Sequence, residues 1–495
     1  MKINNLDKVV KTRYQCILLM IGIAVCIWGF SQHSFNTITF GITVVFLNNV
    51  LYAVVHMKER IIFLFFHITF FTFLLARPIF GMLEGSNWWT VTEQAEENVL
   101  FSLFLITLTL VFILLGAMIA SVVYKNKECN VVPKFSNNEF VKYLQAVALI
   151  VFYVTFFFVI IEEGEKLMFM RGKTYLEFYT GFQSHLPDAV HSIASFMRVC
   201  LCIYLGTFPK KKNSIIVLIL FELSAIPSLL IGVRNPIMLN TIFCVLYFVI
   251  RDIKDNSQKW IGRFEKICMI VLTPIALIGM VLIRIDSRNM QFSSWNPLAL
   301  IRDFFEGQGV TFEVLEICYG YRNNLPQRDD INYTFGGMID YWYHGRVGQK
   351  LFGTEALPPG NNVINAVQGN NLSHHLSYAS KQDEYFKGHG WGSSYLLENY
   401  LDWGYIGVAI FSLILGILFI VAMRWLGKKV LVNTIVLISL TTVFFIPRAE
   451  ATGWLTFIVT LQFWLCVGCC YLGAYICCRW KWLQKLLLKV KLVKE

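Results

Sequence analysis

The sequence has little charge for its length. Of 495 residues only 15% are Asp, Glu, Lys or Arg, whereas 56% are hydrophobic. Soluble domains carry about 25% charged residues, so this composition excludes an ordinary soluble enzyme. The chain also has no P-loop, GxGxxG, HExxH or GxSxG motif, and no DxD pair of the kind that holds a metal-bound nucleotide sugar. Nothing in the sequence therefore supports chemistry driven by a bound nucleotide.

What the sequence has instead is a series of long apolar runs. A run of about 20 residues fits the roughly 30 Å hydrocarbon core of a bilayer as a helix. Because more runs follow the first one directly, we expect the first helix to stay as an anchor. The sequence thus predicts an all-α polytopic membrane protein with about twelve transmembrane helices. The twelve windows lie near residues 15–33, 37–55, 61–80, 99–123, 141–161, 188–208, 214–232, 236–250, 267–284, 403–423, 430–447 and 454–476.

The distribution of basic residues predicts the orientation of the chain. If both termini are cytoplasmic, the inside connections hold 27 Lys or Arg and 8 Asp or Glu, against 16 and 24 elsewhere. This bias follows the positive-inside rule and favours contact with anionic lipids over nucleic acid. The predicted regions are spans one to nine, an extracytoplasmic loop with surface helices, the last three spans and a basic cytoplasmic tail. They cover residues 1–284, 285–392, 393–476 and 477–495.

Cysteine usage gives no sign of a disulfide framework or a metal centre. Twelve of the thirteen cysteines fall in predicted spans or on the cytoplasmic side, which leaves Cys318 alone in the outer region. No CxxC pair has further ligands at zinc-site spacing. We interpret the four cysteines of the last span and its end as small packing residues, and we expect no cofactor. These four are Cys469, Cys470, Cys477 and Cys478.

The stretch from Ile285 to Gly392 is the longest polar interruption in the chain. Four of the nine histidines lie in it: His344, His374, His375 and His389. Loops of this length are usually functional. Asn296 as an N-cap, Pro297 as the first helical residue and an apolar stripe through Phe305 predict a helix along the membrane surface. The alternative interpretation is an extracytoplasmic decoration on a transporter.

Arginine and lysine are distributed differently. The inside connections hold 21 Lys and 6 Arg, whereas the rest of the chain holds 5 Lys and 11 Arg. Lysine satisfies the positive-inside rule equally well, but only arginine offers a planar fork for phosphate or carboxylate. Arginines at membrane depth mark functional sites, with pairing to Glu222, Asp286 or Glu450 as the structural alternative. Five lie in or beside spans: Arg77, Arg198, Arg234, Arg284 and Arg448.

The hairpin around Arg234 has an unusual predicted geometry. The apolar run from Ile237 to Ile250 has only 14 residues, which corresponds to about 21 Å of helix. We therefore predict that the turn at residues 232–236 lies below the outer surface of the membrane. Arg234 would then stand in a cavity beside the start of a helix, and both features favour an anion.

Carboxylates and one further arginine gather late in the chain. Ser393 is predicted to cap a helix on which Glu398 and Asp402 share one face, directed to a cavity or to water. The last outer turn, IPRAEATG, carries Arg448 and Glu450. Arginines, acids and histidines together suit a lipid-linked pyrophosphate donor, because transfer needs cations for the leaving group, a base and a cavity.

Three motifs carry a resemblance to a known family: GVRNP at residues 232–236, FFEGQGVTFEVL at residues 304–315, and GxGxS followed by ExYxDxGYxG at residues 390–407. With the span pattern, they make the chain similar to Wzy-type O-antigen and capsular polysaccharide polymerases. The resemblance implies transfer of a growing glycan from undecaprenyl pyrophosphate to a lipid-linked oligosaccharide repeat unit. The reaction would be inverting and metal-independent, at the outer face of the bacterial cytoplasmic membrane. A chain-length regulator and a flippase of the same pathway are the implied partners.

We assign site residues from this resemblance. In the related ligases a histidine stands about where Ser393 stands here, so we rank His389 first as base, Glu398 second, and place Arg234 with them. An O-antigen or teichoic-type ligase and a lipid-linked oligosaccharide flippase remain the alternative functions. The expected substrate-binding residues are Arg288, Arg448, Arg284, Arg77, Glu450 and Asp402.

Overall fold

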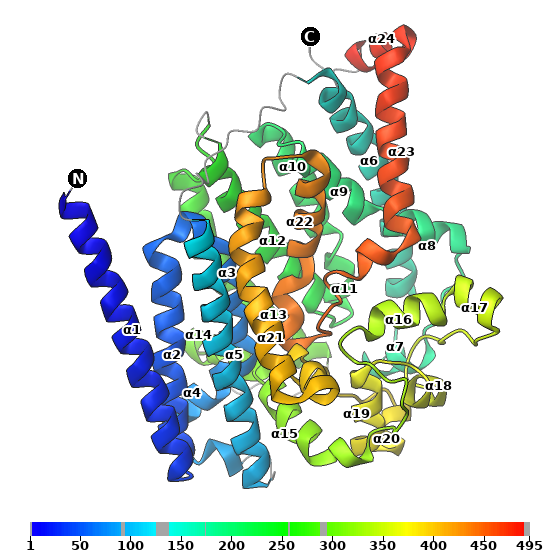
Figure 1. Cartoon of the computed structure of the whole chain (residues 1–495). Coiled ribbons are helices and arrows are strands. Elements are labelled where there is room, and N and C mark those ends of the chain that lie inside the picture. Colours follow the sequence, from blue (N-terminus) through cyan, green and yellow to red (C-terminus); the bar gives the residue numbers. More distant parts are fainter. Residues whose placement is uncertain are drawn as a thin grey trace. The chain divides into compact units, whose positions relative to one another are not determined.

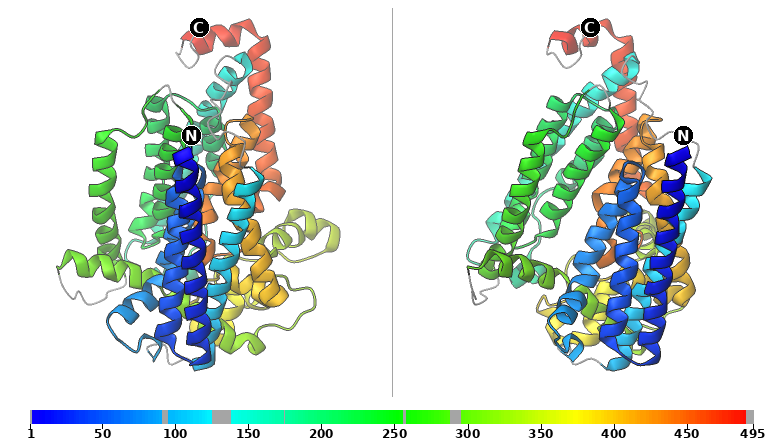
Figure 2. Two further views of the ribbon diagram at one scale, coloured as in Figure 1. Left: turned by 60° about the vertical axis from the view of Figure 1, so that its left-hand side comes forward. Right: turned by 90° about the vertical axis from the view of Figure 1, so that its left-hand side faces the viewer.

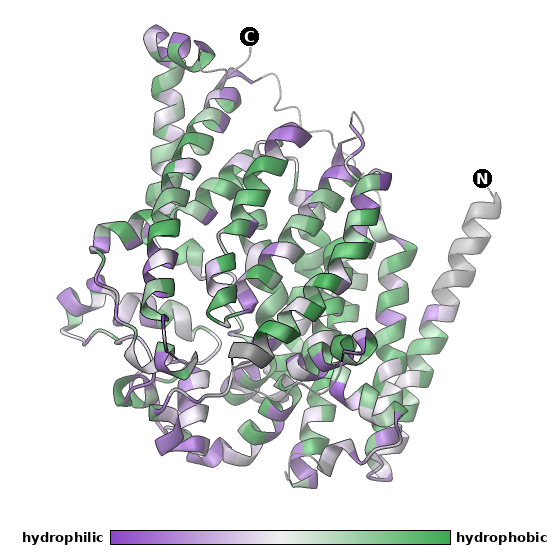
Figure 3. Ribbon diagram, turned by 180° about the vertical axis from the view of Figure 1, so that it is seen from behind, coloured by the Kyte–Doolittle hydropathy of each residue, from purple (hydrophilic) through white to green (hydrophobic). Residues whose placement is uncertain are grey.

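The computed structural model of the chain describes residues 2–90, 95–124, 138–173, 175–255, 258–287 and 295–489. Within these ranges all regular structure is helical and there is no strand (Figure 1). Twelve of the described segments are long and apolar enough to cross a membrane. Figure 3 shows that these long helices are mostly hydrophobic and that hydrophilic residues gather at their ends and in the connections. The predicted all-α class and the number of spans are confirmed.

The chain forms two compact units. Unit 1 consists of Met1–Lys127, Asn296–Met423 and Phe444–Thr452, so the first four spans fold with the long segment that precedes the tenth. Unit 2 consists of the three remaining pieces, Glu128–Trp295, Arg424–Val443 and Gly453–Glu495.

The first four spans of unit 1 are antiparallel apolar helices joined by short turns. Figure 2 shows α1 and α2 side by side along their length. The elements are α1 (Lys2–Ser31), α2 (Phe35–Val55), α3 (Met57–Phe70), the π-helical η1 (Phe71–Leu75), α4 (Ala76–Leu83), the short η2 (Trp88–Thr90) and α5 (Glu96–Val123).

The π-helical turn in the third span has a cause in the sequence. Pro78 has no N–H, and its ring would clash with the carbonyl four residues earlier in a regular α-helix. The wider turn of η1 lies directly before this position and relieves the clash. Arg77, one of the predicted site residues, therefore stands at the point where the helix geometry changes.

Close contact between α5 and α21 (Tyr395–Trp425) ties the early spans to the helix that follows the long segment. A Cβ atom at Gly116 would lie 2.0 Å from the carbonyl oxygen of Leu413, and one at Gly416 would lie 2.0 Å from that of Ile113. Only glycine allows two helix backbones to approach this closely.

The long segment of unit 1 is folded into short helices. Its first helix is the one that the sequence predicts, because the Asn296 side chain accepts a hydrogen bond from the Leu298 N–H at 3.0 Å and Pro297 follows it. The segment contains α14 (Pro297–Gln308), α15 (Thr311–Tyr321), η4 (Arg322–Asn324), α16 (Gly336–Tyr343), α17 (Arg346–Phe352), α18 (Val363–Val367), α19 (Leu372–Lys381) and α20 (Asp383–Phe386).

Helix α21 is broken near its start. Trp403 and Gly404 have non-helical backbone angles, and Gly404 has a φ of +63° that favours glycine. The break separates a first part, which carries Glu398 and Asp402, from the long apolar part. Residue Ser394, not the predicted Ser393, caps this helix, because its hydroxyl accepts a hydrogen bond from the Leu396 N–H at 3.4 Å.

Unit 2 holds the other spans. One polar contact in its core joins the Asn433 side chain to the Gly206 carbonyl oxygen at 2.7 Å. The elements are α6 (Glu139–Phe169), α7 (Tyr175–Gly181), α8 (Asp188–Ser195), α9 (Met197–Gly206), α10 (Lys211–Leu223), α11 (Ile226–Leu230), α12 (Asn235–Lys254), α13 (Arg263–Ser287), α22 (Val430–Thr442), η5 (Val443–Arg448, mostly in unit 1), η6 (Thr456–Val459), α23 (Leu461–Arg479) and α24 (Lys481–Lys489).

The prediction that the eighth span is short is wrong. Helix α12 has 20 residues, which at about 1.5 Å per residue is long enough to cross the hydrocarbon core. The sequence places a charge at Arg251, but the helix continues through it because the side chain is only 3% exposed. The guanidinium donates to the Pro209 carbonyl oxygen at 2.9 Å and to the Tyr247 hydroxyl at 3.0 Å, and it lies 4.2 Å from the centre of the Trp260 ring.

We predict that Arg251→Leu destabilises unit 2. The substitution removes two charge-assisted hydrogen bonds and the contact with Asp255 at 3.2 Å, at a cost of about 1.5–3 kcal/mol per bond. The midpoint of thermal unfolding in detergent should fall clearly. The matched control is Arg263→Leu, at an exposed residue that begins α13. Equal midpoints for the two variants would contradict a stabilising role for Arg251.

Candidate functional site

The long segment packs against the ends of the third and fourth spans. Helices α14 and α15 contact α4, η1 and α5. Charged and aromatic pairs hold these contacts in place. Arg302 donates to the Glu84 carboxylate at 2.7 Å, the Tyr319 hydroxyl donates to Glu97 at 3.1 Å, and the Trp88 and Phe312 rings lie 5.4 Å apart.

Two of the predicted substrate-binding arginines meet at the C-terminal end of α14. Arg77 Nε donates to the Glu306 carbonyl oxygen at 2.7 Å, and Arg448 Nη1 donates to the Gln308 carbonyl oxygen at 3.2 Å. Arg77 also forms an ion pair with Glu313. The last carbonyl groups of a helix have no partner within the helix and carry partial negative charge, so cations stabilise this end. These contacts with both arginines therefore stabilise the position of α14.

The sequence predicts that Glu398 faces a cavity or water, but in the structure it faces neither. Its side chain is 0% exposed. One carboxylate oxygen accepts from the Ser393 hydroxyl at 2.6 Å, and the other accepts from the Ala451 N–H at 2.6 Å. A buried carboxylate needs such donors to offset its desolvation. Glu398 therefore joins the start of α21 to the last turn of unit 1.

Asp402, one helical turn later, makes a similar connection. Its two carboxylate oxygens accept from the backbone N–H groups of Tyr333 at 3.1 Å and Thr334 at 2.7 Å. The Thr334 carbonyl oxygen in turn accepts from the Thr452 hydroxyl at 2.6 Å. Asp402 thus anchors the chain just before α16.

Glu450 anchors the other end of the same region. Its carboxylate accepts from the Asn371 side chain at 2.8 Å, directly before α19. Burial, together with the negative charge of Asp340, raises the pKa of Glu450 above its usual value. Asp340 itself accepts from the Asn370 backbone and side chain at 2.9 and 2.8 Å.

His389, ranked first as the base, lies in a surface contact. Its side chain is 43% exposed and its Nε2 is 3.5 Å from Glu384, which is also exposed. Its carbonyl oxygen accepts from Asn361 at 3.2 Å. The structure therefore brings Arg77 together with Arg448, and places Glu398, Asp402 and Glu450 on one network, while His389 has a separate set of contacts.

The remaining predicted residues belong to unit 2. Arg234 is the N-cap residue of α12, and Pro236 stands in the first turn of that helix. The side chains of Arg284 and Arg288 lie outside the described part of the structure. As substrate-binding residues these three stay predictions.

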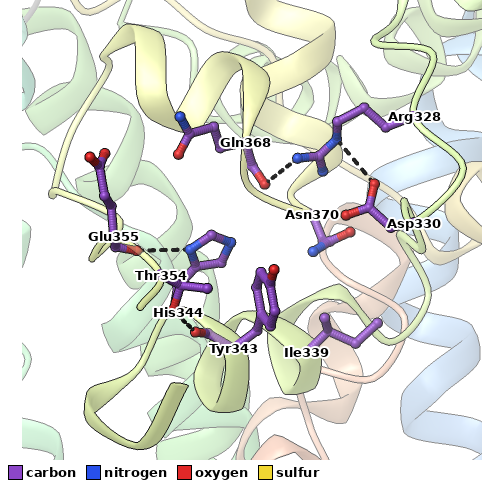
Figure 4. A pocket seen from close by; sticks show the side chains of 9 residues that line it. All are labelled: Arg328, Asp330, Ile339, Tyr343, His344, Thr354, Glu355, Gln368 and Asn370. Carbon is purple, nitrogen blue, oxygen red and sulfur yellow. Dashed lines mark hydrogen bonds and ion pairs between the residues drawn. The ribbon is translucent and has the colours of Figure 1, made fainter. Parts of the chain in front are cut away.

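The long segment contains a pocket that none of the predicted site residues lines. Its volume is about 430 Å³ (Figure 4). All of its lining residues come from the stretch between η4 and α19. They are Arg328, Asp330, Ile339, Tyr343, His344, Thr354, Glu355, Gln368 and Asn370.

Arg328 fixes the upper wall of the pocket as Figure 4 draws it. Its guanidinium donates to the carbonyl oxygens of Gln368 at 2.7 Å and Gly369 at 3.1 Å, and its Nε lies 3.6 Å from the Asp330 carboxylate. These contacts leave the Gln368 side chain exposed at the rim. Asn370, next to it, is held by Asp340.

His344 and Tyr343 form the opposite wall. His344 follows the last residue of α16 and is 9% exposed. Its Nδ1 lies 2.9 Å from the Glu355 carbonyl oxygen, and its ring packs edge-on against Tyr343 with centroids 5.1 Å apart. In Figure 4 the Tyr343 hydroxyl and the second ring nitrogen of His344 point into the space between the walls. The pocket thus combines an aromatic ring, amides, charged groups and one imidazole.

One cluster in unit 2 has the donor atoms of a metal site. The sulfur atoms of Cys200, Cys466 and Cys470 all lie within 4.8 Å of one another, and the three residues are buried. The sulfur atoms of Cys200 and Cys466 lie 3.3 Å apart. Three thiols would suit a soft ion such as Cu(I) or zinc. Their packing between α9 and α23 also agrees with the expectation of small apolar residues at a helix contact.

The twelve candidate spans define the chain as a polytopic membrane protein. Its candidate site, the pocket, lies outside the spans, in the folded segment between the ninth and the tenth. The chain matches the family model of the O-antigen polysaccharide polymerase Wzy over residues 13–481 and belongs to that family. Neither a curated protein nor a solved structure matches it. Family membership confirms the resemblance, and it makes the chain a glycosyltransferase-type polymerase that acts on lipid-linked oligosaccharide repeat units.

We predict that Glu398→Gln keeps most of the stability and activity, because the glutamine oxygen can still accept from the Ala451 N–H and the amide can face the Ser393 hydroxyl. Glu398→Ala should instead lower the free energy of unfolding by about 1–3 kcal/mol, since it leaves a buried N–H without an acceptor. Thermal unfolding and polymer length on gels measure the two effects. A folded Glu398→Gln variant that makes no polymer would return Glu398 to the position of base.

We also predict that the long segment loses stability in acid through His375. Burial, with smaller effects of Arg328 and His374, lowers the pKa of His375 to about 4. The folded state therefore keeps the imidazole neutral, whereas the unfolded chain binds a proton as the pH falls below about 6.5. Stability should fall between pH 6.5 and 4 by up to roughly 3 kcal/mol. His375→Gln should flatten the pH dependence of the unfolding midpoint in this range, and an unchanged slope would contradict the assignment.

Proposed function

We propose that the protein polymerises lipid-linked oligosaccharides at the outer face of the bacterial cytoplasmic membrane. It transfers the growing glycan from undecaprenyl pyrophosphate to the next lipid-linked repeat unit. Family membership supports the polymerase role, and the Lys and Arg bias supports an extracytoplasmic position for the long segment. A chain-length regulator and a flippase of the same pathway are the proposed partners.

The observation that carries this proposal is the pocket of the long segment. Its volume of about 430 Å³ lies within the range of roughly 300–1,000 Å³ of small-ligand sites. Sugars offer hydroxyl groups that pair with amides and charged side chains, and apolar ring faces that pack on aromatic rings. Tyr343, Gln368, Arg328 and Asp330 supply these groups from three sides of the pocket. We assign it to a sugar of the repeat unit.

The reaction in this proposal is a single displacement. A hydroxyl of the acceptor sugar attacks the anomeric carbon of the donor from the side opposite the pyrophosphate, so the configuration inverts. The bond between that carbon and the pyrophosphate oxygen breaks, and undecaprenyl pyrophosphate leaves with the electron pair. Arginines rather than a metal ion stabilise the charge that develops on the leaving group.

Arginines are the proposed ligands of the lipid-linked substrate, because a guanidinium binds phosphate oxygens in pairs. Arg77 and Arg448 also donate to the last carbonyl groups of α14. The proposed set is Arg77, Arg234, Arg284, Arg288 and Arg448.

Purified protein and a lipid-linked repeat unit test the function. We expect a ladder of polymer bound to lipid pyrophosphate in the presence of excess chelator. A ligase would need a second acceptor and give no ladder, and a flippase would only move the unit between leaflets of proteoliposomes. Polymerisation that stops with the chelator and returns with magnesium or manganese would exclude the arginine mechanism while leaving the polymerase assignment intact.

A further inference from the structure

We propose that His344 is the general base of this reaction and that the pocket of the long segment holds the acceptor sugar. The inference rests on the proposed function, since it names the group that removes the proton from the attacking hydroxyl. None of the nine pocket residues is among those that the sequence singled out for the site.

The hydrogen bond of His344 fixes the tautomer of its neutral ring. A carbonyl oxygen only accepts hydrogen bonds, so the contact of 2.9 Å with the Glu355 carbonyl requires the proton to sit on Nδ1. In a neutral imidazole the other nitrogen, Nε2, then keeps its lone pair. Among the described residues no hydrogen-bond partner occupies Nε2, and Figure 4 shows it facing the pocket. This is the state that a general base needs before reaction.

The backbone around His344 is rigid. Its N–H donates to the Asp340 carbonyl oxygen at 3.0 Å, and its own carbonyl oxygen accepts from the Gln349 side chain at 2.7 Å. A Cβ atom at Gly348 would lie 1.8 Å from the Tyr343 carbonyl oxygen, so the corner between α16 and α17 requires a residue without a side chain. Positional rigidity of this kind favours proton transfer, because a base must be placed within hydrogen-bond reach of the hydroxyl.

The other three histidines of the long segment have different surroundings. His375 is 0% exposed and pairs with the Tyr333 hydroxyl at 3.0 Å. His374 pairs with the Tyr385 hydroxyl at 2.8 Å, and burial lowers its pKa. His389 already has Glu384 at its Nε2. None of these three lines the pocket.

The acceptor hydroxyl gives its proton to Nε2 of His344 while its oxygen forms the bond to the anomeric carbon. Undecaprenyl pyrophosphate takes the electron pair of the bond that breaks. The Nδ1–H of the imidazolium still donates to the Glu355 carbonyl oxygen, and the Nε2 proton later passes to water.

The test uses the purified full chain, a lipid-linked repeat unit and a polymerisation assay. His344→Ala should lower the rate by about 100- to 10,000-fold, the usual contribution of a general base. Added imidazole should restore part of this activity, because the small molecule can occupy the vacated space and accept the proton. The matched control is His185→Ala, an exposed histidine of unit 2, which should be unaffected by substitution or by imidazole.

A second variant separates catalysis from folding. His344→Asn places an amide N–H where Nδ1 stood and keeps the hydrogen bond to Glu355, so it should unfold at the wild-type midpoint and still lack polymerisation. An active His344→Asn, or a folded His344→Ala that imidazole does not restore, would overturn the proposal. Imidazole rescue of His389→Ala with an active His344→Ala would move the base to His389. Failure of the wild-type protein to polymerise would refute the proposed function itself.

Discussion

Two carboxylates one turn apart on α21 hold the candidate site together. Glu398 accepts from the backbone of the last turn at Ala451, and Asp402 accepts from the backbone at Tyr333 and Thr334. The same last turn reaches Asn371 through Glu450. The stretch that forms most of the pocket is therefore held in place just before α16 and again just before α19.

Both carboxylates lie on α21, which is broken at Trp403 and Gly404. The first part of α21 carries both carboxylates, whereas the part after Gly404 is a long apolar helix. The break lets the two parts take different directions, so that Glu398 can be buried beside the Ser393 hydroxyl and the Ala451 N–H while the rest of the helix follows α5. At Gly116 and Gly416 the two helices approach so closely that a side chain on either would meet a carbonyl oxygen. Rigid support for the site therefore comes from backbone contacts that only glycine permits.

The sequence predicts what depends on local patterns. Long apolar runs identify all twelve spans, and Asn296 with Pro297 identifies the start of α14, because capping and hydropathy act over a few residues. Contacts between distant residues leave no such pattern. Glu398 meets Ala451 across 53 positions, and nothing local shows that the carboxylate is buried. The sequence-based prediction ended the eighth span at Arg251 because this residue is charged. Its buried partners, Pro209 and Tyr247, could not be predicted from the sequence.

His344 was visible in the sequence as one of four histidines of the long segment. Its place in the pocket and its contact with Glu355, 11 residues away, distinguish it. Neither residue is part of a recognisable motif. The pocket itself is lined by α16 and by the connections between η4 and α19, whose relative positions no periodicity describes. A hydrogen bond to a backbone carbonyl leaves no pattern in the sequence. A site residue that is defined by such a bond therefore cannot be predicted from a single sequence.

The excess of arginine outside the predicted cytoplasmic connections has a structural cause that the sequence did not suggest. Several of these arginines donate to backbone carbonyl oxygens: Arg77 to Glu306, Arg322 to Tyr319, Arg328 to Gln368 and Gly369, and Arg448 to Gln308. Each short helix ends in carbonyl groups without a partner in the helix. A segment built from many short helices therefore needs many donors, and a guanidinium supplies five in a fixed plane. These four arginines therefore account for part of the arginine bias, because they hold the short helices of this segment in place.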